Sequence, residues 1–403
     1  MIVEPKTKGF ICTTAHPRGC EKNVLDDIKY FEAQKKLEMP GIKNALVVGA
    51  STGYGLASAL GASFSLGAKV TAVALEKNAQ KDRGRTASAG MYSLAAYQKE
   101  AGGRQLYLKT IIGDAFAHRT KEKVCEIIKG AGEPIDMVVY SIAAPIRLDP
   151  DTGERHSSVL KPIGKEYSSK AIDLSSFKLS EITIQPATEG EIKSTAKVMG
   201  GEDLELWVSA LSKNDLLKDG AMILSYSYIG PPITHAIYQN GSIGAAKAHL
   251  KATSDRLSGL YGVSSHVSIN KAVVTQSSAA IPVLPLYISI LFKLMKEKGL
   301  HEDCAQQIFR LFEKLRDKDR KDLADGNGFI RMDDFEMLES VQKEVARRWE
   351  MADGENLADL ADLDGYKRDF LKLFGFGAEG VDYGEDVEIE VDLERLGILN
   401  LAD

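Results

Sequence analysis

The sequence has few cysteines and prolines and no excess of positive charge. The four cysteines are too few and too scattered for a disulfide-stabilised scaffold, so a reducing, cytoplasmic compartment is expected. They are Cys12, Cys20, Cys125 and Cys304. A net charge of −6 argues against a general nucleic-acid binder, whose affinity depends on a basic surface. The N-terminus has neither the apolar core of a signal peptide nor an Arg-rich amphipathic leader.

The sequence also lacks an unbroken apolar run that would span a membrane. The nearest candidate is the charge-free stretch 272–292, close to the ~20 residues that a spanning helix needs, but Pro282 and Pro285 interrupt it. We expect a strand over 267–275, a loop over 276–285 and then a helix, which packs as core or as the wall of an apolar pocket. What is present is the ordinary globular mixture of 44% hydrophobic and 27% charged residues, which excludes disordered, collagen-like and coiled-coil chains.

Apolar, β-rich runs alternate with helical patterns between about residues 40 and 145, as a parallel sheet with crossover helices requires. The sequence predicts strands at 45–49, 70–75, 106–112, 135–140 and 222–226, and helices from 202 and over 242–260. The predicted fold is α/β, a Rossmann-like doubly wound parallel sheet with an insertion and a helical C-terminal appendage. We expect one enlarged domain over 1–403, with its core at 40–145 and 202–300, the insertion at 146–201 and the appendage at 301–403.

A glycine-rich loop follows the first of these strands and opens a helix. It reads Gly49-Ala50-Ser51-Thr52-Gly53-Tyr54-Gly55. Glycine permits the tight turn and lets backbone N–H groups and the helix N-terminus approach a pyrophosphate. The loop therefore predicts a dinucleotide site, and a glycine-rich turn without a ligand is the alternative.

The second strand ends at Leu75-Glu76, where a carboxylate can accept both hydroxyl groups of an adenosine ribose. A 2′-phosphate would meet a like charge at Glu76, so NADH is favoured over NADPH. Ligands of open α/β sheets gather at the carboxyl ends of the strands, and two further strand ends reach the same cleft. We predict that Asp114 and Ala115, at one of these strand ends, contact the adenine. Ile142 and Ala143, at the other, are predicted to line the nicotinamide ribose.

Tyr238 and Lys247 are separated by eight residues, which would place them on opposite faces of one continuous helix at about 100° per residue. The stretch 239–242 instead indicates a turn that ends in an N-cap serine, so Tyr238 is expected on a loop and Lys247 in the first turns of a helix. A nearby ammonium would lower the pKa of the phenol, which is ordinarily near 10, and bind ribose hydroxyls. Tyr228 is a second phenol at a strand end and can hold a thioester carbonyl.

Several motifs make the chain resemble the single-chain trans-2-enoyl-CoA reductases and their relatives, the FabV-type enoyl-ACP reductases, over nearly its whole length. They are the opening motif at 9–20, the glycine loop, the segments 140–145, 198–203 and 226–230, the pair Tyr238 and Lys247, and 270–275 leading into 281–287. Ordinary short-chain dehydrogenases place the tyrosine and lysine closer together. Two departures are mild: Leu75 stands where an aromatic residue is common, and Ile142 where leucine is.

The resemblance implies NADH-dependent reduction of the 2,3 double bond of a trans-2-enoyl thioester, by a protein that is usually monomeric. It implies Tyr238 as the proton donor, Tyr228 as the contact to the substrate carbonyl and Lys247 as the lysine of the cofactor ribose. A strand end consisting of Val273, Val274 and Thr275 would lie beside the nicotinamide, and the segment after it would cover an acyl pocket. The carrier is expected to be CoA, with acyl carrier protein left open.

Two other functions fit parts of the sequence. One is a carbonyl reductase of the short-chain type, which acts on an oxoacyl thioester. The other is a non-catalytic Rossmann protein that senses NAD, although such a protein has no need for Tyr238 and Lys247 together. His235 lies near Tyr238 and could tune it, but loop histidines are usually solvated.

No metal site is predicted. The stretch 325–334 is similar to a calcium loop, but Leu323 stands at the first ligand position, so a hairpin turn is expected instead. Cys12, His16 and Cys20 lack a nearby fourth ligand and the spacing of a tetrahedral zinc site.

Overall fold

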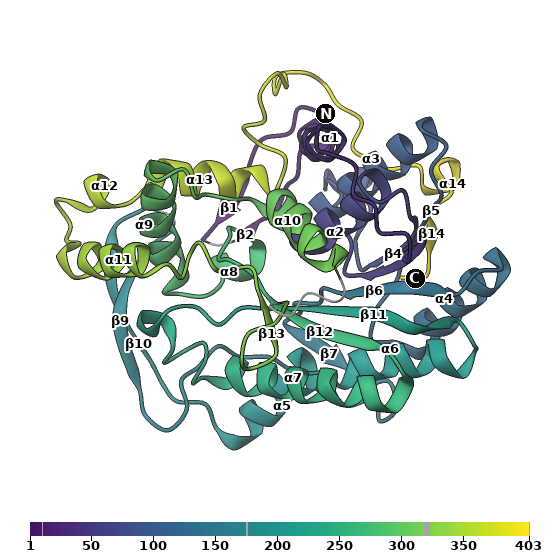
Figure 1. The fold of residues 1–403 in the computed structure, drawn as a ribbon. Helices are drawn as coiled ribbons and strands as arrows, with labels where there is room; N and C mark the ends of the chain where they lie inside the picture. The colour runs from purple at the N-terminus through teal and green to yellow at the C-terminus, as the bar shows by residue number, and fades with distance from the viewer. Residues whose placement is uncertain (10, 175, 318–322, 403) are drawn as a thin grey trace.

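The computed structural model describes residues 1–9, 11–174, 176–317 and 323–402, and its centre is an eight-stranded sheet in which every pairing is parallel (Figure 1). The strands lie in the order β13 (Phe329–Arg331), β12 (Ser264–Ile269), β11 (Leu217–Ser227), β6 (Ile135–Tyr140), β3 (Asn44–Val48), β4 (Lys69–Ala74), β5 (Leu108–Ile112) and β14 (Leu399–Asn400). The chain order reverses beside β3, which creates the crevice where open parallel sheets bind ligands.

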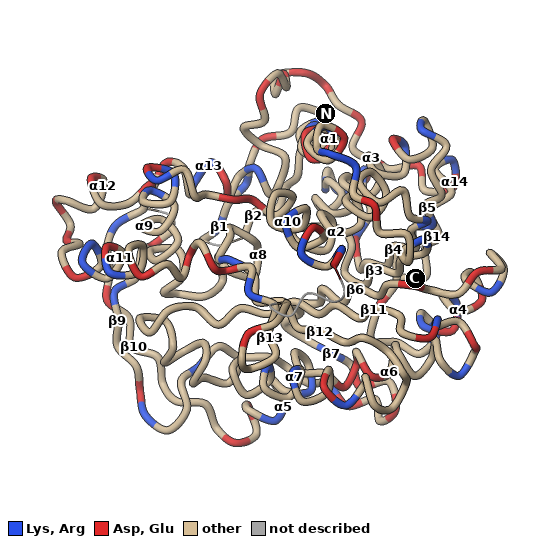
Figure 2. Tube along the Cα trace, viewed as in Figure 1, with Lys and Arg blue, Asp and Glu red and all other residues tan. Residues whose placement is uncertain are grey.

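Helices cover both faces of the sheet, because the central strands are apolar on both sides. Ala45 and Val47 of β3 face one group of helices: α1 (Pro17–Ala33), α2 (Gly53–Phe64), α3 (Ala89–Gly103) and α10 (Cys304–Arg316). Leu46 and Val48 face the other group: α4 (His118–Ala131), α6 (Glu202–Lys213) and α7 (Ser242–Tyr261). Figure 2 shows the central strands almost free of charge and the charged residues on outer helices. The predicted Rossmann-like α/β fold is confirmed.

The strand predicted over 267–275 ends earlier than expected, at Ile269. Its neighbour β11 ends at Ser227, and the carbonyl of that residue accepts the last ladder bond, from Asn270 N–H. The next two backbone N–H groups donate to side chains instead of to a neighbouring strand. The N–H of Lys271 donates to Gln307, and the N–H of Ala272 donates to Glu336. The loop predicted over 276–285 is also interrupted, by the short helix α8 (Gln276–Ala279) and by α9 (Leu284–Glu297), which begins within it.

The insertion forms two small antiparallel pairs and one helix. They are β7 (Ile146–Leu148) with β8 (Arg155–Ser157), the hairpin β9 (Tyr167–Ile172) and β10 (Leu179–Ile184), and α5 (Glu189–Met199). At the other end of the sequence, a small N-terminal pair consists of β1 (Thr7–Lys8) and β2 (Ile11–Cys12).

The C-terminal segment is more than a helical appendage, because it supplies both edge strands of the main sheet, β13 and β14. Its helices α11 (Glu339–Met351) and α13 (Leu363–Lys372) pack against α9 and, with α12 (Leu357–Leu360), form a helical layer beyond the end of the sheet (Figure 1). The short α14 (Leu393–Leu396) lies against α3, near β14. The turn expected after Asp325 is present, but β13 follows it and pairs in parallel with β12 rather than in a hairpin.

The apolar stretch 272–292 contains the short helix α8 and the first part of α9. Within the described ranges, no helix has both the length and the apolar character needed to cross a bilayer. Most of the stretch is fully buried in the protein, because α9 packs its side chains into one core with α11 and α13.

Candidate active site

The glycine loop after β3 is packed too closely for side chains at two positions. Gly49 has φ +89°, and a Cβ atom there would lie 2.2 Å from the carbonyl oxygen of Ser141 at the end of β6. A Cβ atom on Gly55 would lie 1.9 Å from the carbonyl oxygen of Gly49. Thr52 precedes α2 without a side-chain capping bond to any described residue, so first-turn N–H groups of α2 are free for an outside acceptor. The loop therefore fits a pyrophosphate.

Glu76 follows β4 and is held against this loop. Its carboxylate accepts hydrogen bonds from the hydroxyl groups of Ser88 and Ser51, the second of which belongs to the glycine loop. A Cβ atom on Gly90, in the first turn of α3, would lie 2.1 Å from Glu76 Oε1. Burial raises the pKa of Glu76, while the two serine hydroxyls act in the opposite direction. The preceding residue, Leu75, is 61% exposed.

A buried ion pair fixes the next two strand ends. Lys121 Nζ lies 2.7 Å from Asp203 Oδ1 and donates to the carbonyl oxygen of Ala115 at 2.8 Å. The Tyr140 hydroxyl, at the end of β6, donates to Asp203 Oδ2 at 3.0 Å. The ends of β5 and β6 are thus tied to α6 by groups that water does not reach. Asp203 belongs to one of the motifs that carry the family resemblance, but the sequence analysis gave neither it nor Lys121 a role.

The other predicted residues of these two strand ends lie in the same region. The Asp114 carboxylate accepts a hydrogen bond from Phe116 N–H at 2.9 Å, which turns the chain after β5. Ile142 reaches Gly49, since its Cδ1 lies 3.3 Å from the place of a Cβ there. Ala143 is exposed.

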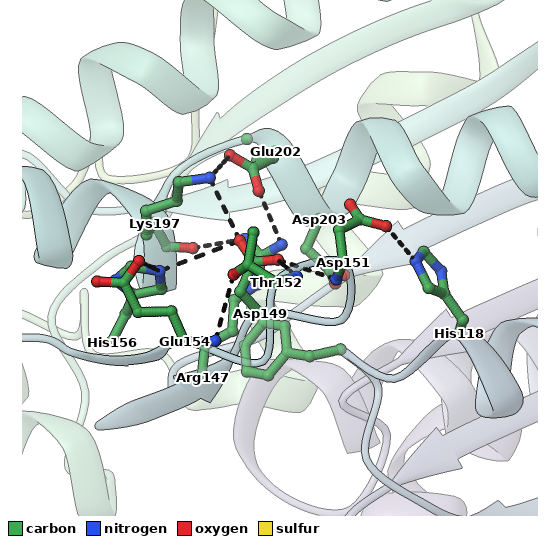
Figure 3. Close-up of polar contacts among 12 residues, drawn as sticks. His118, Arg147, Asp149, Asp151, Thr152, Glu154, His156, Lys197, Glu202 and Asp203 are labelled. Carbon is green, nitrogen blue, oxygen red and sulfur yellow. Dashed lines mark hydrogen bonds and ion pairs between the residues drawn. The ribbon is translucent and has the colours of Figure 1, made fainter.

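A second polar network, beside Asp203, anchors the insertion (Figure 3). Glu202 accepts one hydrogen bond from Arg147 at 2.9 Å and lies 2.8 Å from Lys197 Nζ. Lys197 also lies 3.4 Å from Asp149, which is buried. These contacts join β7 and α5 to the start of α6, so the insertion is held at the carboxyl end of β6.

Tyr238 and Lys247 approach the same short stretch, 226–228, from two elements. Tyr238 lies in a turn before α7, as predicted, and its ring meets that of Tyr228 edge to face with centroids 4.8 Å apart. Lys247 rises from the second turn of α7 and donates to the carbonyl oxygen of Tyr226 at 3.3 Å. One detail of the prediction is wrong. Gly241, not Ser242, caps α7, because the Ser242 hydroxyl is donated to the carbonyl of Val159.

Burial dominates the electrostatics of this pair. It raises the pKa of the Tyr238 phenol above its ordinary value of 10, and it lowers the pKa of the Lys247 ammonium to about 8. The predicted lowering of the pKa of this phenol is therefore wrong, because burial raises it. At neutral pH the Tyr238 phenol is protonated, so it can donate a hydrogen bond, but the raised pKa makes it a weaker acid than a free phenol.

The segment 273–275, which was predicted as a strand end, follows the end of β12 and lies beside the glycine loop. Thr275 Cγ2 is 3.7 Å from the position that a Cβ atom on Gly53 would take, and Val273 and Val274 are buried. Tyr54, from the same loop, donates its hydroxyl to the carbonyl of Lys271 at 2.8 Å. The loop and the strand exit after β12 are thereby joined.

Three other residues bear on the site. His235 is bonded through Nε2 to the carbonyl of Gly230 at 2.9 Å, so it closes the 230–235 turn that leads to Tyr238. The sequence analysis missed Glu336 and Tyr287, whose side chains meet next to Tyr228. Tyr287 lies within the segment 281–287, one of the motifs that carry the family resemblance, whereas no local feature of the sequence indicated Glu336.

An open parallel sheet, a glycine loop at its crevice, a carboxylate after the second strand and a half-buried tyrosine–lysine pair define a dinucleotide-dependent oxidoreductase. Three family models match the chain. The NAD(P)H binding domain of trans-2-enoyl-CoA reductase matches residues 2–81, and its catalytic region matches 85–315. A model described as an enoyl reductase FAD binding domain matches 324–387. The chain therefore belongs to the trans-2-enoyl-CoA reductase family, and the predicted resemblance is confirmed.

Full-length relatives agree with this assignment. A trans-2-enoyl-CoA reductase [NADH] of Ruminiclostridium cellulolyticum is 49% identical, over 98% of this chain and 100% of the relative. An enoyl-[acyl-carrier-protein] reductase [NADH] of Flavobacterium johnsoniae is 48% identical over the same shares. The solved trans-2-enoyl-CoA reductase of Treponema denticola, in complex with NAD, is 45% identical with a TM-score of 0.89, covering 96% of this chain and 98% of that one.

The residues matched by the FAD model do not fit a flavin dinucleotide. Residues 324–387 form β13 and the helices α11, α12 and α13. Within this range no glycine-rich turn leads from a strand into a helix. The turn that follows β13 carries Asp333, Asp334 and Glu336, whose charges would repel a pyrophosphate. We assign FAD no role.

Proposed function

We propose that this protein uses NADH to reduce the 2,3 double bond of a trans-2-enoyl thioester to the saturated acyl thioester. The observation that carries the proposal is the convergence of Tyr238 and Lys247 on the stretch 226–228, beside a glycine loop that fits a pyrophosphate. The Ruminiclostridium and Flavobacterium relatives bear the names of NADH-dependent reductases of this substrate class.

The proposed cofactor site follows the strand ends. The glycine loop 49–54 would hold the pyrophosphate, and Glu76 the adenosine ribose. Asp114 and Ala115 would contact the adenine, and Ile142, Ala143 and Lys247 the nicotinamide ribose. Val273, Val274 and Thr275 would line the nicotinamide side. When bound, NADH supplies the hydride that reduces the β-carbon of the substrate.

The protein's own residues handle the charge that this reduction places on the thioester oxygen. Tyr238, which is protonated at neutral pH, would donate to that oxygen as the enolate develops and would supply or relay the proton that completes the reaction. Tyr228 would line the substrate carbonyl, and its hydroxyl would donate to that oxygen only by leaving its bond to Glu336. Lys247 would hold the cofactor ribose and thereby set the distance between the reacting carbons.

The acyl chain would lie under the segment 276–292, whose apolar side chains join one buried core with α11 and α13. We propose that the substrate is a trans-2-enoyl-CoA, with enoyl acyl carrier protein as the second candidate. Relatives of nearly equal identity carry both names, and both carriers present the same thioester and pantetheine arm.

The test compares NADH oxidation by the purified protein with crotonyl-CoA, dodecenoyl-CoA and the matching acyl carrier protein thioesters. We expect loss of enoyl absorbance that keeps pace with NADH consumption. A protein that instead consumes NADH only with acetoacetyl-CoA would be a carbonyl reductase of the short-chain type. One that binds NADH but consumes none with either substrate would be an NAD sensor.

The remaining proposals concern the protein as a whole. We propose a cytoplasmic monomer that acts in fatty acid metabolism and folds as one domain over residues 1–403. The free thiols of Cys12, Cys20, Cys125 and Cys304 favour a reducing compartment. The placement of β13 and β14 within the main sheet favours one domain. Light scattering of the purified protein at several concentrations tests the monomer.

A further inference from the structure

Glu336 is a fully buried carboxylate at the carboxyl edge of the sheet, next to the tyrosines of the candidate active site. It belongs to the turn 334–337 between β13 and α11. β13 runs parallel to β12, so the chain leaves both strands at the edge where the glycine loop also lies. The N–H groups of Met332 and Asp333 both donate to the carbonyl of Ile269, at 2.8 and 3.1 Å, which fixes the turn to the end of β12.

Three hydrogen-bond donors converge on this carboxylate. The hydroxyls of Tyr228 and Tyr287 donate to Oε1 at 2.9 and 2.6 Å, and the N–H of Ala272 donates to Oε2 at 2.7 Å. An acceptor with three donors is satisfied as the anion, because a protonated carboxyl would turn its own hydrogen toward one of them. Burial raises the pKa of Glu336, and the hydrogen bonds from Tyr287 and Ala272 and the charge of the fully buried Lys271 act in the opposite direction.

The carboxylate determines which way the Tyr228 phenol faces. A phenol has one hydrogen, and that of Tyr228 is directed at Glu336. The same bond holds the Tyr228 ring edge to face against Tyr238, with the ring planes at 84°. A shift of about 1 Å at such a contact can change turnover by about 100-fold, since the reacting groups must be aligned.

The surrounding residues hold Glu336 itself in place. Gln342, on α11, donates through Nε2 to the Tyr287 hydroxyl at 3.1 Å and to the backbone carbonyl of Glu336 at 2.7 Å. On the other side, Arg310 lies over the Phe335 ring at 4.3 Å and pairs with Asp334 at 2.7 Å. The turn is thus clamped on both sides.

We propose that Glu336 is a positioning residue for enoyl reduction, which sets the Tyr228 phenol opposite Tyr238. The inference rests on the proposed function and deepens it, because it makes the turn between β13 and α11 part of the catalytic centre. Glu336 acts through Tyr228 and touches neither substrate nor cofactor.

The test is a double-mutant cycle of Glu336→Gln and Tyr228→Phe, with kcat measured on crotonyl-CoA and saturating NADH. Glutamine keeps the size of the side chain but offers a single acceptor oxygen, so it cannot satisfy both phenols and the Ala272 N–H. We expect kcat to fall by roughly 10- to 100-fold while the Kd of NADH stays unchanged. In the Tyr228→Phe background, the same substitution should change kcat by less than about twofold.

Two results would overturn the inference. One is a wild-type kcat in Glu336→Gln, and the other is the same loss with and without the Tyr228 hydroxyl, which would mean a general structural role. If Glu336→Gln does not fold, Tyr287→Phe replaces it in the cycle, because it removes one donor from the same oxygen and keeps the charge. Glu339→Gln, on the exposed start of α11, is the control and should match the wild type.

The activity of the wild-type protein distinguishes a failure of the proposed function from a failure of the role proposed for Glu336. If it reduces no enoyl thioester at all, the proposed function fails and this inference fails with it. If the wild type is active and the cycle is additive, only the role of Glu336 is wrong.

Discussion

The rings of Tyr228 and Tyr238 meet edge to face, with centroids 4.8 Å apart and planes at 84°. The two tyrosines reach this contact from different elements, one from the end of β11 and the other from the turn before α7. Their phenols have different surroundings, because Tyr228 donates a hydrogen bond to Glu336 whereas burial alone raises the pKa of Tyr238. Two neighbouring phenols are therefore suited to different tasks.

Tyr238→Phe should lower kcat on crotonyl-CoA by about 10²- to 10⁴-fold, the usual effect of losing a general acid. Phenylalanine keeps the ring contact with Tyr228, so the Kd of NADH and the melting temperature should stay near the wild-type values. Stopped-flow absorbance measures the turnover, and fluorescence titration measures cofactor binding. Turnover equal to that of the wild type would end the assignment of Tyr238.

The affinity for NADH should depend on pH through Lys247. Burial lowers the pKa of its ammonium to about 8 in the free protein, and ribose hydroxyls that accept from the ammonium would raise that pKa in the complex. Binding then takes up a proton above pH 8. The Kd should be constant below pH 8 and rise up to about tenfold per pH unit above it, until the pKa of the complex is reached.

Calorimetric titrations between pH 6.5 and 9.5 test this dependence. Lys247→Met has no proton to gain, so its Kd should be weaker than that of the wild type and nearly independent of pH over the same range. The assignment of Lys247 to the ribose would be wrong if the wild type showed the same flat profile.

Glu76→Gln should raise the use of NADPH relative to NADH by roughly 10- to 100-fold in kcat/KM, equivalent to about 1–3 kcal/mol. The substitution removes the charge that would repel a 2′-phosphate and keeps the shape of the side chain. Ser88→Ala, which deletes a hydrogen bond to Glu76 but leaves the charge, is the matched control and should preserve the preference for NADH. An unchanged ratio in Glu76→Gln would place the ribose elsewhere.

Gly55→Ala should weaken NADH binding and destabilise the fold by about 1–3 kcal/mol, because its Cβ would lie 1.9 Å from the carbonyl oxygen of Gly49. Gly102→Ala is the matched control. It lies in α3 with nothing within 4 Å of the new atom, so the same substitution there should stabilise the protein by up to ~1 kcal/mol. Urea unfolding with and without NADH separates the change in the free energy of unfolding from the change in NADH affinity. A Gly55→Ala protein with the stability and the NADH affinity of the wild type would contradict the packing argument.

The glycine loop and the carboxylate beside it could be predicted from the sequence because each signal is local. Gly49 to Gly55 directly follow a buried strand, and Glu76 directly follows the next, so the order of the chain alone places them at one sheet edge. The turn before α7 was also readable, since Gly241 interrupts the helical pattern between Tyr238 and Lys247.

What the sequence determined by itself was the class of fold, the glycine loop and the placement of Tyr238 and Lys247, all of which depend on residues close together in the chain. Only the tertiary structure decided where β12 ends and what lies beside Tyr228. The chain beyond β12 is held by Gln307 and Glu336, and Glu336, which stands 108 positions from Tyr228, reaches it through the parallel pairing of β13 with β12. Burial, which the sequence does not give residue by residue, also reversed the expected direction for the pKa of Tyr238.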